Sequence, residues 1–305
     1  MSDVSLRRAK EIEEYMLEHG EELTIKQYDI SNETLSRYLR TANRTSTNRH
    51  VKVLILDIET LFLEVRSWSL YPKYIDYKQI VKDKCVLSWS GKWLYSSEVM
   101  GDVMTPEEAV VRNDKRIVKS IWKLLDECDI AISHNGVRFD LPELNARFLH
   151  HSIPPPSNYQ QIDTLRELKK HFRYTSNRLD YIGKLLVNDQ KLPTNMALWE
   201  RCDRGEQEAL DEMLEYNKQD VNLLEECYLL IRPYIKAHPN IALYSESQEE
   251  CCPSCGSTKI TECGYYTTPS GRYESLRCEC GALSRRRKSI LSKKERDNLL
   301  ISNAR

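Results

Sequence analysis

The sequence predicts an α/β protein: a mixed β-sheet flanked by helices, preceded by a small all-helical unit and followed by a small β unit. The first observation is an apolar, β-branched run at Val51–Thr60, which has the character of a buried strand. The second is that short apolar segments then alternate with helical patterns as far as Pro233. The third is that six of the ten cysteines crowd between Cys251 and Cys280, where apolar residues are too few for a separate core.

Length and composition set the protein class. A chain of 305 residues can build one sizeable core with small attachments. With 30% charged and 40% hydrophobic residues, it has the composition of an ordinary globular protein. The formal net charge of −1 excludes a uniformly basic coat, so nucleic-acid binding would need local patches. No apolar run approaches a membrane span, and the first residues lack the apolar core of a signal peptide. We therefore expect an intracellular, cytoplasmic protein with no membrane partner.

The first 43 residues are predicted to form a compact helical unit. An amphipathic helix over 5–19 ends at His19 and Gly20, and a short helix follows over 24–28. A third helix, over 30–40, has Ser31 as a suitable N-cap residue. Three short helices with a tight turn before the last resemble a helix-turn-helix module.

The third helix of this unit displays Arg37 and Arg40. Arginines on a recognition helix can meet phosphates or guanine edges in the major groove, so we expect these two to contact DNA. The alternative is a plain helical cap or dimerisation unit, because surface arginines are usually just solvated. Residues 44–50 are polar and lack periodicity, which is typical of a linker.

The α/β domain is predicted to begin with three strands in meander order. They lie at 51–60, 85–89 and 92–95, with Ser90-Gly91 at a turn between the last two. A further short buried strand is predicted at 129–133.

The helices of this domain follow from their apolar periodicity. They are predicted at 113–126, 141–150, 164–171 with Asp163 as its N-cap, 178–186, and 206–231, which ends before Pro233. The domain is accordingly placed at 51–236, with a polar, acidic linker at 237–250, the β unit at 251–290 and a tail at 291–305.

Two carboxylates end the first strand of the domain. Asp57 and Glu59 stand at i and i+2, so both project from the same face as Val53 and Ile55. Two like charges at the rim of an apolar sheet repel each other unless a cation lies between them. The alternative is a strand whose charged end stays solvated.

Two more acidic residues stand out later in the domain. Asp140 precedes a predicted helix, and its alternative interpretation is an N-cap that forms a capping box with Glu143. Asp220 lies one helical turn after Tyr216, so both share a face of the long helix. The alternative for this pair is a solvated helix surface.

The order of these motifs resembles the DEDD superfamily of 3′→5′ exonucleases, and specifically its tyrosine-bearing DEDDy branch. The chain has a strand ending Asp-x-Glu, a His-Asn-x-x-x-Phe-Asp turn at 134–140, and Tyr-x-x-x-Asp at 216–220. The resemblance covers 51–233 and is nearest to stand-alone phage or bacterial enzymes, since no polymerase domain fits in the remainder. The histidine-bearing branch would have His in place of Tyr216, and His134 is expected to be structural or substrate-adjacent.

The resemblance implies a ribonuclease-H-like fold and hydrolysis of phosphodiesters by a two-metal mechanism with Mg²⁺ or Mn²⁺. By resemblance, Asp57 bridges both metals, Glu59 and Asp220 complete the nucleophile-side metal, Asp140 supports the other, and Tyr216 orients the attacking water. The substrate would be nucleic acid, with DNA favoured over RNA, and Asn135 in the turn would contact it. The alternative is a non-catalytic nucleic-acid-binding regulator with a degenerate nuclease core.

The cysteine-rich segment resembles a zinc ribbon. A Cys-x-x-Cys-Gly motif at 252–256 and a Cys-x-Cys-Gly motif at 278–281 frame a predicted hairpin whose turn is at 268–271. The expected ligands of a structural zinc are Cys252, Cys255, Cys278 and Cys280. Because the second motif is one residue short, Cys251 or Cys263 could replace one of them.

Basic and aromatic residues line the predicted hairpin and its exit. Such residues on a small rigid platform suit single strands or phosphates, while the alternative is a solvated basic tail. The nucleic-acid-binding candidates are Arg272, Arg285, Arg286 and Arg287, with Tyr265, Tyr266 and Tyr273 interleaved.

Overall fold

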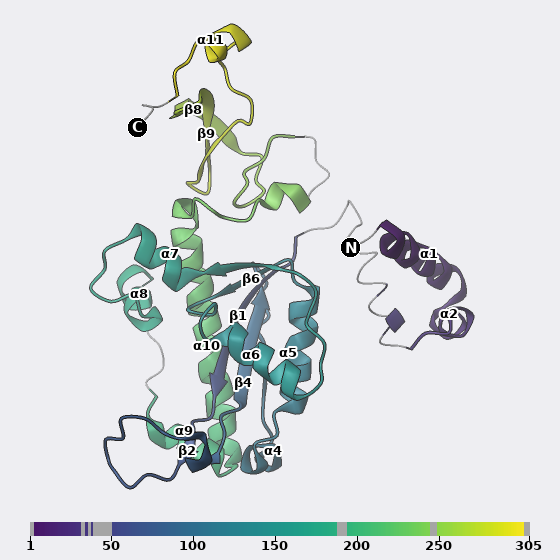
Figure 1. Cartoon of the computed structure of the whole chain (residues 1–305), viewed down its shortest axis with the longest axis vertical. Helices are drawn as coiled ribbons and strands as arrows, with labels where there is room; N and C mark the ends of the chain where they lie inside the picture. The colour runs from purple at the N-terminus through teal and green to yellow at the C-terminus, as the bar shows by residue number, and fades with distance from the viewer. Residues whose placement is uncertain are drawn as a thin grey trace. The chain divides into compact units, whose positions relative to one another are not determined.

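The structure is a computed structural model. It describes residues 3–31, 34, 35, 38, 51–187, 194–244 and 249–301. The chain divides into two compact units, which are described separately: residues 1–51 with 240–258, and residues 52–239 with 259–305. Figure 1 labels most of the helices and several of the strands. Within the described ranges, no helix has both the length and the apolar character that a membrane crossing requires.

The first unit contains two of the three predicted N-terminal helices, α1 (Asp3–His19) and α2 (Glu21–Tyr28). Gly20 separates them with a φ of 84°, a left-handed conformation that glycine adopts without strain. The third predicted helix, including Arg37 and Arg40, lies mostly outside the described residues, as does the linker at 44–50. DNA contact by this unit therefore stays a prediction.

The second unit is built on a five-stranded sheet, which is mixed as predicted. Its order is β5 (Met100–Val103), β4 (Val86–Trp93), β1 (Val53–Thr60), β6 (Ile130–Ser133) and β7 (Gln160–Asp163). Strand β4 is antiparallel to both β1 and β5, whereas β6 is parallel to both β1 and β7. The strand with the two carboxylates is thus central.

The predicted turn at Ser90-Gly91 is wrong, because β4 runs through it without a break. Ser90 pairs with Asp57 and Gly91 pairs with Leu56 in the antiparallel ladder. A Cβ at Gly91 would lie 3.2 Å from the carbonyl oxygen of Ile55. The glycine therefore reflects close approach of a neighbouring strand rather than a turn.

The predicted helices of the domain are all present, and their bounds agree within two residues. They are α5 (Lys115–Glu127), α6 (Asp140–His150), α7 (Thr164–His171), α8 (Leu179–Leu186) and α10 (Gln207–Ile231). Asp163 is the N-cap of α7, as predicted, and accepts a hydrogen bond from the backbone N–H of Arg166 at 3.2 Å.

Several shorter elements were not predicted. Besides β5 and β7, they are β2 (Glu64–Val65), β3 (Ile80–Lys82), α4 (Pro106–Val111) and α9 (Met196–Asp203). β2 and β3 pair as a two-stranded antiparallel sheet.

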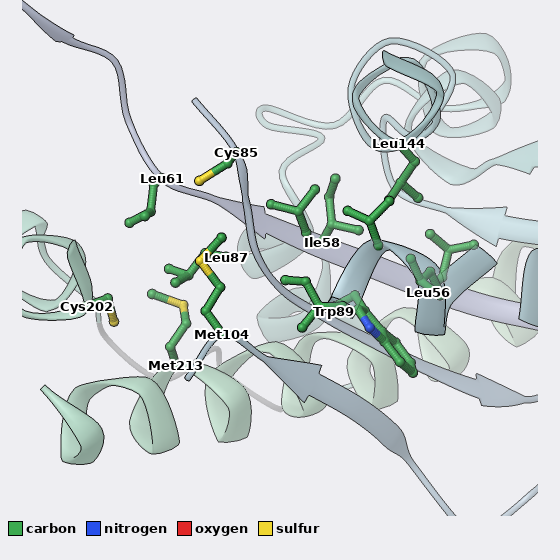
Figure 2. Close-up of a cluster of buried hydrophobic side chains, with 14 of the residues drawn as sticks. Leu56, Ile58, Leu61, Cys85, Leu87, Trp89, Met104, Leu144, Cys202 and Met213 are labelled. Atoms are coloured by element: carbon green, nitrogen blue, oxygen red, sulfur yellow. The ribbon is translucent and has the colours of Figure 1, made fainter. Parts of the chain in front are cut away.

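Side-chain alternation on β1 places Asp57 and Glu59 on the face opposite Leu54, Leu56 and Ile58. Leu54, Leu56 and Ile58 lie in the main core, in one buried cluster with Leu144 of α6 (Figure 2). Each such side chain contributes about 1.5–3 kcal/mol by leaving water. Helix α10 packs against β1 and β4, and its Asn217 reaches the opposite face of β1, where Asp57 lies. The core thus fixes the strand that carries the carboxylates.

A fully buried carboxylate, Asp114, joins three elements of this domain. It accepts hydrogen bonds from the backbone N–H of Val86 at 2.9 Å, from the Arg147 guanidinium at 2.6 Å, and from His151. Burial alone would raise the pKa of Asp114, but the hydrogen bonds from Arg147, His151 and Val86 outweigh it and hold the pKa below its ordinary value.

We expect Asp114→Asn to lower the free energy of unfolding at pH 7 by about 3–5 kcal/mol, because it leaves the Arg147 charge without its partner. The folded-state pKa is depressed, so this stabilisation is present above the ordinary aspartate pKa of about 3.9 and is lost as the pH falls through the folded-state value. Urea unfolding at pH 7 and below pH 4 measures both effects. Glu127→Gln breaks an exposed pair with Lys52 and should cost less than about 1 kcal/mol. Equal stability of wild type and Asp114→Asn at pH 7 would contradict the assignment.

The C-terminal part of the second unit is a three-stranded antiparallel sheet in the order β10 (Leu283–Arg285), β9 (Gly271–Cys278), β8 (Ile260–Thr268). It confirms the predicted hairpin, whose strands close at the pair Thr268 and Gly271. A bulge between Glu262 and Tyr265 contains Gly264, with a φ of 106°. A short helix, α11 (Lys293–Asp297), follows.

Candidate active site and cysteine cluster

Three carboxylates that are distant in the sequence meet beside the central strand. Asp57 and Glu59 from β1 and Asp220 from α10 each offer an oxygen, and these oxygens lie within 4.8 Å of one another. Asp220 is buried, and the other two are half-buried. Carboxylates this close repel each other in a poorly solvated site, and a hard divalent cation relieves that repulsion. The donor set therefore fits Mg²⁺ or Mn²⁺.

Asp220 belongs to the inward stripe of α10. Met213, Tyr216, Asn217, Asp220 and Leu224 recur at helical spacing and are all buried. The alternative of a solvated surface for Tyr216 and Asp220 is therefore wrong. The stripe places two polar side chains and one carboxylate against the sheet.

Asn217 is a site residue that the sequence reasoning missed. Its side-chain N–H donates to Asp57 Oδ2 at 2.7 Å, and its Oδ1 accepts from the hydroxyl of Ser88 at 3.4 Å. It is fully buried. Because the amide is neutral, it fixes the orientation of Asp57 without cancelling the negative charge that a cation needs. The available signal was a polar residue on the helical stripe that runs from Met213 to Leu224 and also carries Tyr216 and Asp220.

Asp140 reaches the same strand through a different contact. Its Oδ1 accepts a hydrogen bond from the backbone N–H of Ile58 at 3.1 Å, and its side chain is buried. The capping-box alternative is wrong: the N-cap of α6 is Phe139, which makes no side-chain cap bond, and Glu143 forms an ion pair with Lys84. Asp140 is thus held against the backbone between Asp57 and Glu59.

The turn before Asp140 is fixed by hydrogen bonds. His134 uses both ring nitrogens, contacting Thr164 Oγ1 at 2.9 Å and the carbonyl oxygen of Asn177 at 3.0 Å, which confirms a structural role. Asn135 adopts a φ of 73°, and its backbone N–H donates to Asp163 at 3.0 Å. Asp163 therefore anchors the turn and caps α7 at once. Nucleic-acid contact by Asn135 stays a prediction.

An aromatic pair joins the long helix to the end of β1. The ring of Tyr216 packs edge-on against Trp199 of α9, with centroids 6.4 Å apart and an interplanar angle of 73°. The indole N–H of Trp199 donates to the carbonyl oxygen of Thr60 at 3.2 Å. This arrangement holds Tyr216 near the strand end that carries Glu59, and Trp199 was not identified from the sequence.

The cysteine cluster contains the four residues predicted from the two motifs. One sulfur from each of Cys252, Cys255, Cys278 and Cys280 lies within 4.8 Å of the others, which is compatible with zinc. Cys263 is exposed, and its thiol contacts Ser275 Oγ at 3.6 Å.

Each cysteine motif ends in a glycine that its turn requires. Gly256 and Gly281 have φ values of 77° and 88°, in the left-handed region. Their backbone N–H groups donate to the carbonyl oxygens of Cys252 at 2.8 Å and Cys278 at 2.9 Å. The spacing Cys-x-Cys-Gly therefore closes a turn as Cys-x-x-Cys-Gly does.

The arginines of the hairpin differ in their partners. Arg272 lies over the Tyr265 ring at 4.1 Å, and Arg285 lies over Tyr273 at 4.0 Å. Arg286 instead forms ion pairs with Glu274 and Glu262. The charge of Arg286 is thus partly neutralised, whereas Arg272 and Arg285 are stacked on rings.

Residues 100–231 match a family model described as RNase_H superfamily. The matched range runs from β5 to the end of α10 and includes Asp140, Tyr216 and Asp220; Asp57 and Glu59 precede it. No curated protein matches the sequence. The mixed sheet, its flanking helices and this match together show that the fold of the α/β domain is ribonuclease H-like.

Proposed function

We propose that this protein is a metal-dependent 3′→5′ exonuclease of the DEDDy type, which hydrolyses phosphodiester bonds of DNA or RNA. The observation that supports it most is the convergence of Asp57, Glu59 and Asp220 within 4.8 Å beside the central strand of a ribonuclease H-like domain. A ribonuclease H-like domain suggests nuclease activity on nucleic acid, and the carboxylates give that activity a site.

In this proposal, Asp57, Glu59, Asp140 and Asp220 hold two Mg²⁺ or Mn²⁺ ions. Two such ions supply an activated water and stabilise the charge that develops on the phosphate. Asn217 keeps the Asp57 carboxylate oriented before the ions bind. The hydroxyl of Tyr216 would accept a hydrogen bond from the attacking water or donate one to it, and so orient it.

We assign binding of the substrate outside the carboxylate site to the C-terminal hairpin and the segment that follows it. Arg285, stacked on Tyr273, and Arg272, stacked on Tyr265, offer cations and ring faces to a nucleic acid, together with Arg287. The ion pairs of Arg286 make it the weakest candidate of the hairpin.

Digestion of end-labelled single- and double-stranded DNA and RNA by the purified full chain tests the function. With Mg²⁺ or Mn²⁺ we expect release of mononucleotides from the 3′ end, and with EDTA we expect none. Tight binding without cleavage in every condition would favour a non-catalytic regulator and contradict the proposal.

We also propose that Cys252, Cys255, Cys278 and Cys280 bind one structural zinc. The hairpin strand β8 is exposed at most of its positions, so the C-terminal sheet has little apolar burial to hold it together. Thiolate–zinc bonds would supply that stabilisation.

Elemental analysis of the full chain should find about one zinc per molecule. Cys278→Ser should abolish zinc retention and increase hydrogen exchange in β8 and β9, since it removes a buried ligand. Cys263→Ser is the matched control, because this exposed thiol lies outside the cluster, and it should retain zinc. Retention of zinc by Cys278→Ser would disprove this ligand set.

A further inference from the structure

A loop follows β2, which Figure 1 labels, and links it to β3. We call residues 66–78 the aromatic arm. Aromatic residues recur in it at every third position, and their side chains are largely exposed to solvent. They are Trp68, Tyr71, Tyr74 and Tyr77, of which Trp68 is fully exposed and Tyr71 is 90% exposed.

The arm is ordered by its own hydrogen bonds. At its base, the backbone N–H of Arg66 donates to the carbonyl oxygen of Gln79 at 2.9 Å, and the Gln79 side chain donates back to the Arg66 carbonyl at 3.0 Å. Asp76 and Gln79 form a capping box around a 3₁₀ turn, Tyr77–Gln79. The rings are therefore presented by a defined backbone, which lowers the entropy cost of binding.

The base of the arm is attached to the domain that holds the carboxylates. Lys82 of β3 forms an ion pair with Asp203 of α9 at 3.0 Å, and Arg112 donates to the carbonyl oxygen of Phe62 at 2.7 Å. The arm begins only seven residues after Glu59, at the exit of β1. These two contacts attach the base of the arm near the end of the strand that carries the site.

The charge of the arm favours an anionic ligand. Arg66, Lys73 and Lys78 are cationic, and the single acidic side chain, Asp76, already accepts the backbone N–H of Lys78 at 2.9 Å. The arm is therefore positive in a chain whose net charge is −1. Among the described ring contacts, none joins two of the four rings. Lys78 Nζ lies 6.0 Å from the centroid of the Tyr77 ring, so the separate stacking faces are those of Trp68, Tyr71 and Tyr74.

We propose that the aromatic arm binds single-stranded nucleic acid by base stacking, with its cations on the phosphates. Every base has a π-face, so a row of exposed rings binds a single strand with little sequence preference, whereas paired bases in a duplex hide their faces. The choice of ligand rests on the proposed function, but binding to the arm needs no turnover. The arm holds the strand whose end enters the carboxylate site.

The test measures the affinity of full-length protein for fluorescein-labelled oligothymidylate, in an Asp57→Asn background that spares the oligonucleotide. Trp68→Ala and Tyr71→Ala should each weaken binding about 10-fold, the usual scale for one lost base–ring stack. Trp68→Phe keeps a ring and should retain most of the affinity. Leu149→Ala removes an exposed side chain of α6, 82% exposed, and should change nothing.

Fluorescence gives a second measure that does not depend on activity. Base stacking on Trp68 should quench part of the tryptophan emission, and Trp68→Phe should lose that component while it still binds. If Trp68→Ala and Tyr71→Ala bind the oligonucleotide as tightly as the parent protein, and the wild type hydrolyses its substrate, the proposed binding by the arm is wrong and the proposed nuclease activity stands. If the alanine variants lose affinity but the wild type hydrolyses no nucleic acid, binding by the arm is supported and the proposed nuclease function is wrong. Altered sedimentation of these variants at unchanged oligonucleotide affinity would show a protein contact and overturn the proposal.

Discussion

Asp57→Asn is expected to reduce hydrolysis below detection while the domain stays folded. The substitution preserves the size of the side chain and leaves one oxygen that can accept the Asn217 N–H, but it removes the negative charge that two cations would share. Loss of one charge from the group with Glu59 and Asp220 also relieves repulsion, so the metal-free variant should unfold at a temperature equal to or above that of the wild type. Single-turnover digestion of a 3′-labelled strand, with Mg²⁺ titrated, and thermal unfolding measure the two effects.

Two further variants separate charge from position. Asp211→Asn changes an exposed carboxylate on the same helix as Asp220, so it should leave turnover unchanged. Asn217→Ala keeps the Asp57 charge but removes the 2.7 Å hydrogen bond that orients the carboxylate. We therefore expect its turnover to lie between those of the wild type and Asp57→Asn, and we expect it to need a higher Mg²⁺ concentration. Near-normal turnover of Asp57→Asn would disprove the assignment of Asp57 as a metal ligand.

The sequence predicted the elements whose apolar pattern is long and regular. The alternation in β1 places Leu54, Leu56 and Ile58 in the core and Asp57 on the opposite face, as the structure shows. The helices agree because each has an apolar stripe that is buried: α5, α6 and α10 pack on the sheet, and α7 and α8 pack on α10. This pattern was sufficient for the fold class, because it defines which faces must be buried.

The missed and mistaken elements have weak local signals. β7 begins with the exposed pair Gln160 and Gln161, and β5 contains Gly101 and Asp102, so neither strand has an apolar alternation. Ser90-Gly91 has turn chemistry, but the packing of β4 against β1 overrides it.

Only part of the candidate site was predicted from the sequence, because only some of its residues have a local sequence signal. Asp57, Glu59 and Asp220 stand out in the sequence, because ionised side chains beside apolar residues need a compensating partner. Asn217 and Trp199 act on residues 160 and 139 positions away, so their roles depend on how α9 and α10 pack against β1. No local sequence pattern shows that Asn217 contacts Asp57 or that Trp199 contacts Thr60.

Tyr216→Phe is expected to lower single-turnover hydrolysis by about 10²–10⁴-fold, the usual scale for one group that handles a proton or its water. The ring stays packed against Trp199, so the fold and the metal ligands should be unaffected. The loss should fall mainly on kcat, because the hydroxyl acts more strongly in the transition state than in the ground state. Initial rates over a range of substrate concentrations, with the Mg²⁺ dependence of each variant, measure this.

Tyr228→Phe provides the matched control on the same helix. Its buried hydroxyl contacts His238 Nε2 at 2.7 Å, so its removal should lower the free energy of unfolding by about 1 kcal/mol and leave kcat unchanged. If the Tyr216 hydroxyl only supports packing, Tyr216→Phe should lower the free energy of unfolding and leave kcat unchanged, as expected for Tyr228→Phe. If the hydroxyl positions water, Tyr216→Phe should lower kcat and leave the free energy of unfolding unchanged. If Tyr216→Phe instead lowers stability and leaves kcat intact, Tyr216 is a packing residue, and the carboxylates carry the chemistry without it.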